Sequence, residues 1–305
     1  MQPKLEASNN NKINVDGVGN SNERFIKLPT GKPHVSFSEL RVWQDCTYRH
    51  KLQFIDQIEK FQPSSAIDFG TAVHAAHEQF IKTKLMDPTI ATTMIQQLWE
   101  KNDHKDLTVK IASEQAIAAL SEIPEFYEKT FPNWNPIAAE LQLYEEISDD
   151  HQQAFKGFID AIIEVPGHKG KKTIWILDLK STSWGWQSKK KSDPNVTQQL
   201  TFYKNFWTKK VGVDPKNVKC GFIILKRTAK DGGRCELVKV SVGDVTTGRS
   251  LKVLRSMLTT VKKGIAIKNR SSCTYCPYLN TEHCLLQKNA LVTPVSQILR
   301  CHEIS

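Results

Sequence analysis

The chain has 305 residues, of which 39% are hydrophobic, and a formal net charge of +10. This is enough for a sizeable core, and no apolar run reaches the length of a membrane span or forms an N-terminal signal segment. Seven cysteines, an odd number, argue against a secreted disulfide scaffold. We therefore expect an intracellular, cytoplasmic protein whose basic excess favours a polyanionic partner.

The N-terminal part is predicted to be a tail followed by a helix. Residues 1 to about 30 contain Asn9-Asn10-Asn11 and no apolar period, which predicts disorder. A helix begins at Ser36, because Ser36 and Glu39 have capping-box spacing. Cys46 follows; considered alone, it is more often a buried thiol than a ligand.

A helical subdomain is predicted over about 66–130. Its first helix covers about 66–85, Asp87-Pro88 supplies the N-cap and first residue of the next, and further helix covers about 110–129. His74 and His77 are three residues apart and can share a helix face. A single helical histidine is usually structural or exposed, so His74 indicates a site only in a wider context.

Three strands follow. Residues 138–147 form the first, and Glu140 on it either faces a cleft or is an exposed carboxylate at the strand edge. Residues 155–165 alternate in polarity and residues 173–180 are nearly all apolar, with Pro166 to Gly170 as turn residues between them. The strands over 155–165 and 173–180 are therefore predicted to form a β-hairpin. The second of these strands is predicted to be covered on both faces.

This hairpin carries the charged residues Asp160, Asp178 and Lys180. Asp178 and Lys180 point the same way along their strand, and normal register brings Asp160 near them. Buried charges are costly unless they are paired or bind a metal. Two carboxylates beside a lysine suit a hard divalent cation, which would polarise a phosphoryl oxygen and lower the pKa of a bound water. The alternative is a buried structural ion pair.

The loop after Lys180 contains Trp184, Trp186 and the lysine run 189–191. Basic charge beside aromatic faces suits a nucleic-acid strand, although a lysine run is usually only a solvated loop.

The second half alternates helices and strands. Asp193-Pro194 opens a helix that ends near Gly212 and presents Gln199 and Tyr203 on one face. The remaining predicted elements are strands over 219–226 and 236–242 and a helix from Asp244 to about Lys263. We expect Cys220 to be a core strand residue.

A cluster of three cysteines, Cys273, Cys276 and Cys284, comes near the C-terminal end. Together with Cys46 they make four thiols with one Cys-x-x-Cys spacing. Such a set suits tetrahedral zinc or a four-iron cluster, and spacing does not separate the two.

Five motifs in this order resemble the RecB-like branch of the PD-(D/E)xK nuclease superfamily. They are similar to members with an iron–sulfur cluster, the AddB nuclease domain and the CRISPR-associated RecB-like exonucleases. The motifs are Phe69-Gly70-x-x-x-His74, Gly157-x-x-Asp160, Asp178-x-Lys180, Gln199-x-x-x-Tyr203, and Cys46 with Cys273, Cys276 and Cys284. The resemblance runs from about Ser36 to Cys284. Two departures are Asp178, where the family often has Glu, and a long gap before Cys284, beside which His283 is a substitute ligand.

The resemblance implies an α/β fold of restriction-endonuclease type, a mixed sheet flanked by helices, over residues 31–290, with a C-terminal tail over 291–305. It implies that Mg²⁺ or Mn²⁺ is held by His74, Asp160, Asp178 and the carbonyl of Leu179. Lys180 would position the attacking water, and Gln199 and Tyr203 would hold the DNA strand or the catalytic loop.

The four cysteines, Cys46, Cys273, Cys276 and Cys284, would hold a [4Fe–4S] cluster, with Zn²⁺ as the alternative, and tie the end of the chain to the first helix.

The expected function is that of a metal-dependent DNA exonuclease acting on DNA ends or single strands in recombination, repair or replication. The alternatives are a non-catalytic subunit that binds DNA ends within a larger complex, and a sequence- or structure-specific endonuclease. By association, a compact nuclease of this kind fits a phage or mobile-element enzyme working beside recombination or replication proteins.

Overall fold

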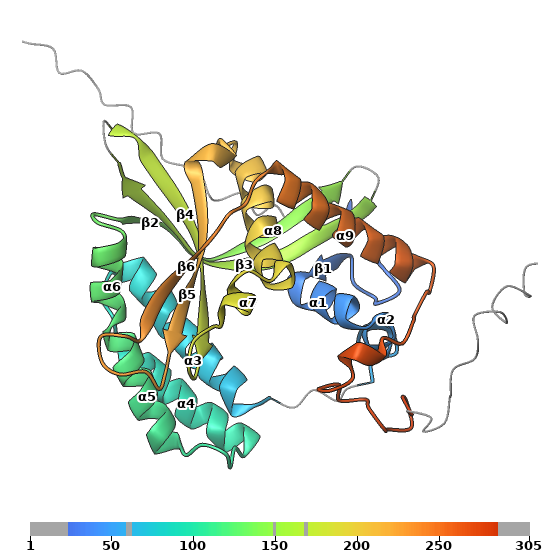
Figure 1. Cartoon of the computed structure of the whole chain (residues 1–305), viewed down its shortest axis with the longest axis horizontal. Coiled ribbons are helices and arrows are strands. Elements are labelled where there is room, and N and C mark those ends of the chain that lie inside the picture. The colour runs from blue at the N-terminus through green and yellow to red at the C-terminus, as the bar shows by residue number, and fades with distance from the viewer. Residues whose placement is uncertain (1–23, 59–62, 149–150, 168–169, 286–305) are drawn as a thin grey trace, which may run out of the picture.

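A six-stranded mixed sheet lies between two groups of helices in the computed structural model, which describes residues 24–58, 63–148, 151–167 and 170–285 (Figure 1). The strands are β1 (His34–Ser36), β2 (Asn135–Ser148), β3 (His151–Pro166), β4 (Lys172–Thr182), β5 (Val218–Lys226) and β6 (Cys235–Val240). The predicted α/β class, with a mixed sheet flanked by helices, is therefore confirmed.

Strand β3 is the hub of the sheet. It pairs with β2 and β4 in antiparallel fashion and with the short β1 in parallel. Strand β4 then pairs in parallel with β5, which pairs antiparallel with β6. The sequence did not indicate β1, because three residues are too few to show a period.

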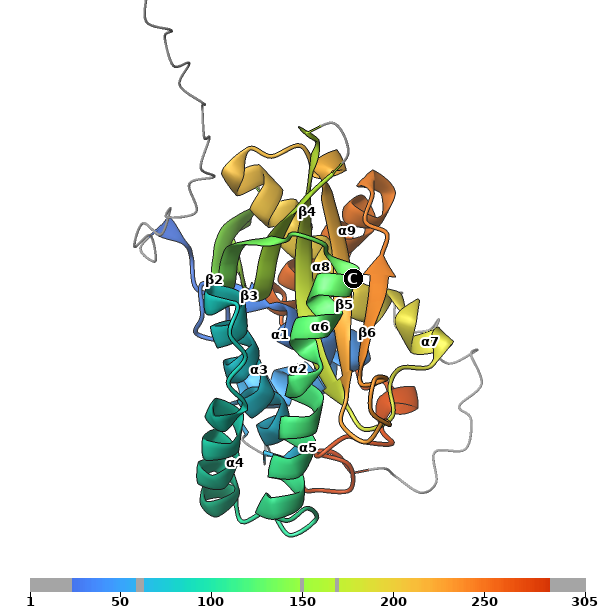
Figure 2. The same ribbon diagram turned by 90° about the vertical axis from the view of Figure 1, so that its left-hand side faces the viewer.

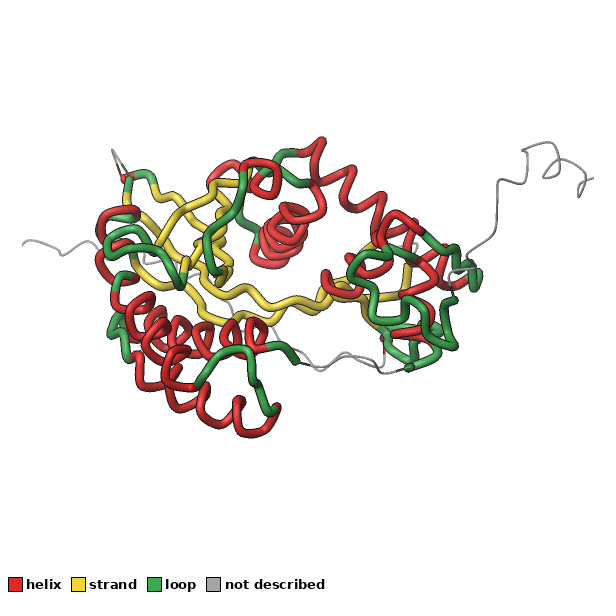
Figure 3. Tube along the Cα trace, turned by 60° about the horizontal axis from the view of Figure 1, so that its bottom comes forward, coloured by secondary structure: helices red, strands yellow, loops and turns green. Residues whose placement is uncertain are grey.

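Helices cover both faces of the sheet, as the views in Figures 2 and 3 show. The helices in chain order are α1 (Phe37–Asp45), α2 (Thr47–His50), a π-helical turn (Lys51–Ile55), α3 (Ser65–Thr83), α4 (Pro88–Asn102), α5 (Val109–Ser121), α6 (Ile123–Thr130), α7 (Ser188–Lys191), α8 (Pro194–Val211) and α9 (Asp244–Lys262). Helices α3 to α6 pack on one face, and α1, α8 and α9 pack on the other.

The two cores explain the apolar run of β4. Ile174 and Ile176 pack in the cluster with α8 and α9, whereas Trp175 and Leu177 pack in the cluster with α3 to α6. Successive side chains of a strand point to opposite faces, so a strand covered on both sides must be apolar throughout.

Three helices begin at the N-cap residues that the sequence predicts. The side chains of Ser36, Asp87 and Asp193 accept hydrogen bonds from backbone N–H groups of α1, α4 and α8. At α1, however, the Glu39 carboxylate contacts His50 Nε2 at 2.9 Å, and both side chains are buried. Glu39 therefore links α1 to α2 across the buried side of the helix.

The predicted N-terminal tail is too long. Phe25 and Leu28 are buried, and the Ile26 N–H donates to the Gln152 carbonyl at 2.8 Å. Residues 24–30 thus belong to the packed domain, because two apolar side chains reach its core. Residues 1–23 of that tail and the predicted C-terminal tail, 291–305, lie outside the described residues. None of the described helices is long and apolar enough to cross a membrane.

Helix α3 buries a histidine against helix α6. His77 is 1% exposed, and its Nε2 lies 2.8 Å from the hydroxyl of Tyr127, which is also fully buried. Burial lowers the pKa of His77 to about 4. The folded state therefore holds this imidazole neutral.

We expect His77 to make folding pH-dependent. In the unfolded chain its pKa is near 6.5, so below that pH the unfolded state binds a proton that the folded state does not bind until about pH 4. The free energy of unfolding should therefore decrease by about 2 kcal/mol between pH 7.5 and 5 on account of this group. Urea denaturation of wild type and His77→Gln should show that the variant lacks this decrease.

Tyr127→Phe is the control, since it leaves His77 buried and should keep the pH-dependent decrease. Equal losses of stability in wild type and His77→Gln over this range would contradict the assignment.

Candidate active site

The strand register brings the two aspartates of the hairpin together. The ladder between β3 and β4 ends at the pair Ala161 and Leu177, and the next position in that register pairs Asp160 with Asp178. Continued pairing would put both side chains on one face of the sheet, but the regular ladder stops before them. The strands separate here, and Asp160 Oδ2 accepts a hydrogen bond from the Leu179 N–H at 2.7 Å.

Where the two strands separate, the backbone of Leu179 lies beside the carboxylates. The N–H and C=O of one strand residue point to the same side of the strand. Since the Leu179 N–H points to Asp160, the Leu179 carbonyl points to the same side of β4.

Helix α3 brings His74 to the same carboxylate. His74 Nδ1 lies 3.4 Å from Asp160 Oδ2, and Asp160 is 8% exposed. Burial alone would raise the pKa of Asp160, but His74 and Lys180 outweigh it and the pKa lies below its usual value. Burial also lowers the pKa of His74, but Asp160 opposes this and the pKa is raised overall.

Helix α8 and strand β4 hold the second carboxylate. Asp178 is 1% exposed; its Oδ1 accepts from Gln199 Nε2 at 2.7 Å, and its Oδ2 lies 2.7 Å from Lys180 Nζ. Burial raises the pKa of Asp178 to about 6, although Lys180 opposes the shift. Burial would lower the pKa of Lys180, but the two carboxylates raise it overall. Lys180 is therefore an ammonium at neutral pH.

The residues Gly157 and Tyr203 fit against one another. Tyr203 is 4% exposed and its hydroxyl accepts from Gln199 Nε2 at 3.0 Å. A Cβ added at Gly157 would lie 2.7 Å from Tyr203 Cε1, closer than real Cβ contacts allow. The glycine three residues before Asp160 is thus required by the tyrosine ring on α8.

One carboxylate near the site was left open by the sequence. Ala139 and Leu141 pair with Ala161 and Ile159, so Glu140 lies across β2 and β3 from Asp160. Its backbone has φ +48°, which is rare for a residue other than glycine. Partial burial and then Asp160 raise the pKa of Glu140. Glu140 itself is exposed, which matches the strand-edge alternative, and it also lies near enough to Asp160 for the two charges to interact.

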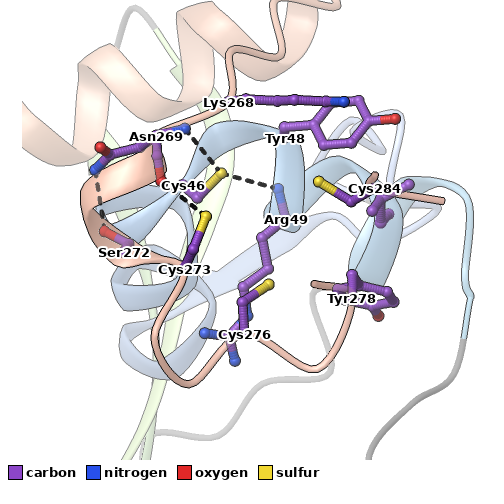
Figure 4. A pocket seen from close by; sticks show the side chains of 11 residues that line it. Cys46, Tyr48, Arg49, Lys268, Asn269, Ser272, Cys273, Cys276, Tyr278 and Cys284 are labelled. Carbon is purple, nitrogen blue, oxygen red and sulfur yellow. Dashed lines mark hydrogen bonds between the residues drawn. The ribbon is translucent and has the colours of Figure 1, made fainter. Parts of the chain in front are cut away.

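The four predicted cysteine ligands line a single pocket, although Cys46 is more than 200 residues before the other three (Figure 4). Cys46 Sγ accepts from the backbone N–H groups of Arg49 and Asn269 at 3.4 and 3.3 Å. Cys220, by contrast, is a buried strand residue, as predicted, and Cys301 lies outside the described residues.

In the described part of the chain, no group of three or more His, Cys, Asp or Glu side chains is already arranged as metal ligands. The two aspartates instead contact His74, Lys180, Gln199 and a backbone N–H. Their chemistry nevertheless fits a cation, since two carboxylates, an imidazole and a carbonyl are ligands for Mg²⁺ or Mn²⁺. Four thiols likewise fit zinc or iron.

Comparison with known proteins identifies similar chains. A protein-family model described as the PD-(D/E)XK nuclease superfamily matches residues 34–281. Among solved structures, that of a presumed exonuclease from Eubacterium rectale is similar, with a TM-score of 0.52 and 13% identity over 99% of this chain and 100% of that one. No curated protein matches. The structural similarity, at this identity, concerns the fold.

The contact between Gly157 and Tyr203 generates a prediction about stability. Gly157→Ala should lower the free energy of unfolding by about 1–3 kcal/mol, because the added methyl group overlaps the ring. In a Tyr203→Ala background the same change should have a clearly smaller effect, since of these contacts only Phe155 Cε1 at 3.2 Å then remains. Urea denaturation of the four proteins measures the coupling.

Gly248→Ala on α9 is the matched control, since nothing lies within 4 Å of its added Cβ. It should be neutral or stabilising. A Gly157→Ala penalty that is equally large without the tyrosine ring would contradict the explanation.

Proposed function

Because the chain belongs to the PD-(D/E)XK nuclease superfamily, we propose that it is a metal-dependent deoxyribonuclease of the RecB-like branch. The observation that carries this proposal is the meeting of Asp160, Asp178, Lys180 and His74 where the β3–β4 ladder ends. The proposed substrate is a DNA end or a single strand. The name of the similar Eubacterium rectale structure, a presumed exonuclease, supports exonucleolytic over endonucleolytic cleavage.

Asp160, Asp178, His74 and the Leu179 carbonyl would hold Mg²⁺ or Mn²⁺. When bound, the cation supplies Lewis-acid polarisation of the phosphoryl oxygen and a nucleophilic water at neutral pH. The low pKa of Asp160 keeps this carboxylate ionised and ready to bind a cation. Because Asp160 also accepts from the Leu179 N–H, the backbone of β4 fixes the position of this carboxylate.

Lys180 has the protonation state needed to stabilise negative charge. Its side chain is 33% exposed, and its Nζ lies 2.7 Å from Asp178 Oδ2. Because its pKa is raised, Lys180 acts as a hydrogen-bond donor that orients the attacking water and stabilises the charged phosphorane-like transition state, and it does not act as a general base.

Gln199 and Tyr203 are proposed to be positioning residues. Gln199 Nε2 donates to Asp178 and also to the Tyr203 hydroxyl, so one amide fixes the carboxylate relative to α8. Tyr203 is 4% exposed and offers little surface to a DNA strand. Of the two roles suggested by the RecB-like resemblance, these contacts favour support of the catalytic residues over direct binding of DNA.

We further propose that Cys46, Cys273, Cys276 and Cys284 hold a [4Fe–4S] cluster, with Zn²⁺ as the alternative. The pocket lies between α2 and the segment after α9, and backbone hydrogen bonds already join these parts, among them the Tyr48 N–H to the Ile267 carbonyl at 3.1 Å. A metal centre there would close a loop of more than 200 residues and so stabilise the whole domain.

The proposed nuclease domain covers residues 31–290, together with the packed residues 24–30, and its helical subdomain covers about 66–130. The net charge of +10 supports DNA as the substrate. The proposed biological setting is processing of DNA ends in recombination, repair or replication, beside proteins of those pathways.

The decisive test is a nuclease assay with Mg²⁺ or Mn²⁺ on linear and closed circular DNA. Wild type should degrade linear DNA and leave closed circles intact. Lys180→Ala should reduce the cleavage rate by about 10²- to 10³-fold, because it removes a charged donor from the transition state. Lys172→Ala is the matched control: Lys172 lies on the same strand and pairs with Glu164 at the surface.

Binding of DNA ends without cleavage, unchanged by Lys180→Ala, would favour a non-catalytic subunit. Cutting of the closed circle would favour an endonuclease.

The metal centre has a separate test. Cys276→Ser should lose bound iron or zinc and lower the free energy of unfolding by about 3 kcal/mol or more, comparable with the loss of a cross-link. Metal analysis and urea denaturation measure both effects. Cys235→Ser is the control, because Cys235 lies on β6 and outside the pocket. Wild-type protein that is free of iron and zinc, and as stable as Cys276→Ser, would contradict the proposal.

A further inference from the structure

Trp184 is an exposed indole on the loop that follows β4. Its exposed fraction is 82%, and it lies four residues after Lys180. Exposed apolar side chains are common singly on protein surfaces, so exposure alone indicates nothing. What distinguishes Trp184 is that the backbone on both sides of it is fixed.

The residue before Trp184 is held by four hydrogen bonds. The Ser183 carbonyl accepts from the Thr228 hydroxyl at 2.6 Å and from the Thr228 N–H at 3.3 Å. The Ser183 hydroxyl accepts from Arg227 Nε and Nη2 at 3.1 and 2.9 Å. The turn after β4 is thereby tied to the end of β5.

The residues after Trp184 are held by packing. Gly185 has φ +98°, and a Cβ there would lie 2.9 Å from Lys226 Cδ. Trp186 is 9% exposed and its ring centroid lies 5.1 Å from that of Phe222. Trp184 is therefore presented to solvent on a loop with little conformational freedom left to lose, and such preorganisation favours binding.

Basic side chains lie near both this loop and the proposed active site. Lys190 Nζ lies 4.7 Å from the Trp186 ring centroid. Arg41 on α1 is exposed and is close enough to act electrostatically on both Lys180 and Lys190. These cations would attract phosphates along the path from the active site to the indole.

From these features we propose that Trp184 is a stacking platform for an unpaired base of the DNA substrate. The inference rests on the proposed nuclease function and specifies its substrate as single-stranded or frayed ends. The four residues from Lys180 to Trp184 span at most about 13 Å, which is about four stacked nucleotides. The inner bases of a duplex have both faces covered by neighbouring base pairs, so the platform selects unpaired bases and tolerates any sequence.

Binding measured in EDTA, where the proposed cleavage cannot occur, tests the platform. Trp184→Ala should weaken binding of a single-stranded oligonucleotide by about 5- to 150-fold in fluorescence anisotropy. Binding of a blunt duplex should change far less. The control Leu85→Ala, which removes another side chain that is 73% exposed, should leave both affinities unchanged.

Two further variants separate stacking from apolar contact and remain informative if the alanine variant unfolds. Trp184→Phe keeps an aromatic face and should retain most of the single-strand affinity, whereas Trp184→Leu should lose it. Equal single-strand affinities for wild type, Trp184→Phe and Trp184→Leu would overturn the inference while leaving the nuclease proposal intact. Wild-type protein that neither binds nor cleaves any DNA would instead overturn the proposed function.

Discussion

The structure depends on one electrostatic constraint: two aspartates, Asp160 and Asp178, occupy facing positions at the end of a buried hairpin. Two carboxylates close together in a low-dielectric interior repel one another and lose hydration. In this fold each of the two carboxylates contacts a basic side chain and a hydrogen-bond donor. Lys180 and Gln199 contact Asp178, while His74 and the Leu179 N–H contact Asp160.

These partners come from both helical layers, and this explains the shape of the fold around the site. Helix α3 brings His74 from one face of the sheet, and α8 brings Gln199 from the other (Figure 1). Both can reach the carboxylates because β3 and β4 separate after Ala161 and Leu177. A continuous ladder would have kept the two layers apart. Side chains from the two helical layers therefore meet at this break in the sheet.

Gly157 and Tyr203 support the carboxylate site indirectly, through Gln199. Gly157 lets Tyr203 lie against the backbone of β3, and Tyr203 supports Gln199. The cysteine pocket lies at a different place, where the segment after α9 meets α2. We therefore regard the carboxylate site and the cysteine pocket as physically separate. The first holds paired charges within the sheet, and the second brings the segment after α9 to α2.

Local chemistry was readable from the sequence alone. The side-chain caps Ser36, Asp87 and Asp193, the apolar run of β4, and the shared direction of Asp178 and Lys180 follow from helix ends and strand periodicity, which depend only on near neighbours. The order of the motifs was enough to indicate the superfamily that the family comparison supports.

Only the tertiary structure decided the features that rest on contacts between distant segments. The packing of residues 24–30, the short strand β1, the pairing of Glu39 with His50 and the burial of Tyr203 have no local signature. The left-handed backbone of Glu140 is likewise invisible in a strand pattern. Each depends on which distant surface a residue meets, and a periodicity read along one segment contains no information about that surface.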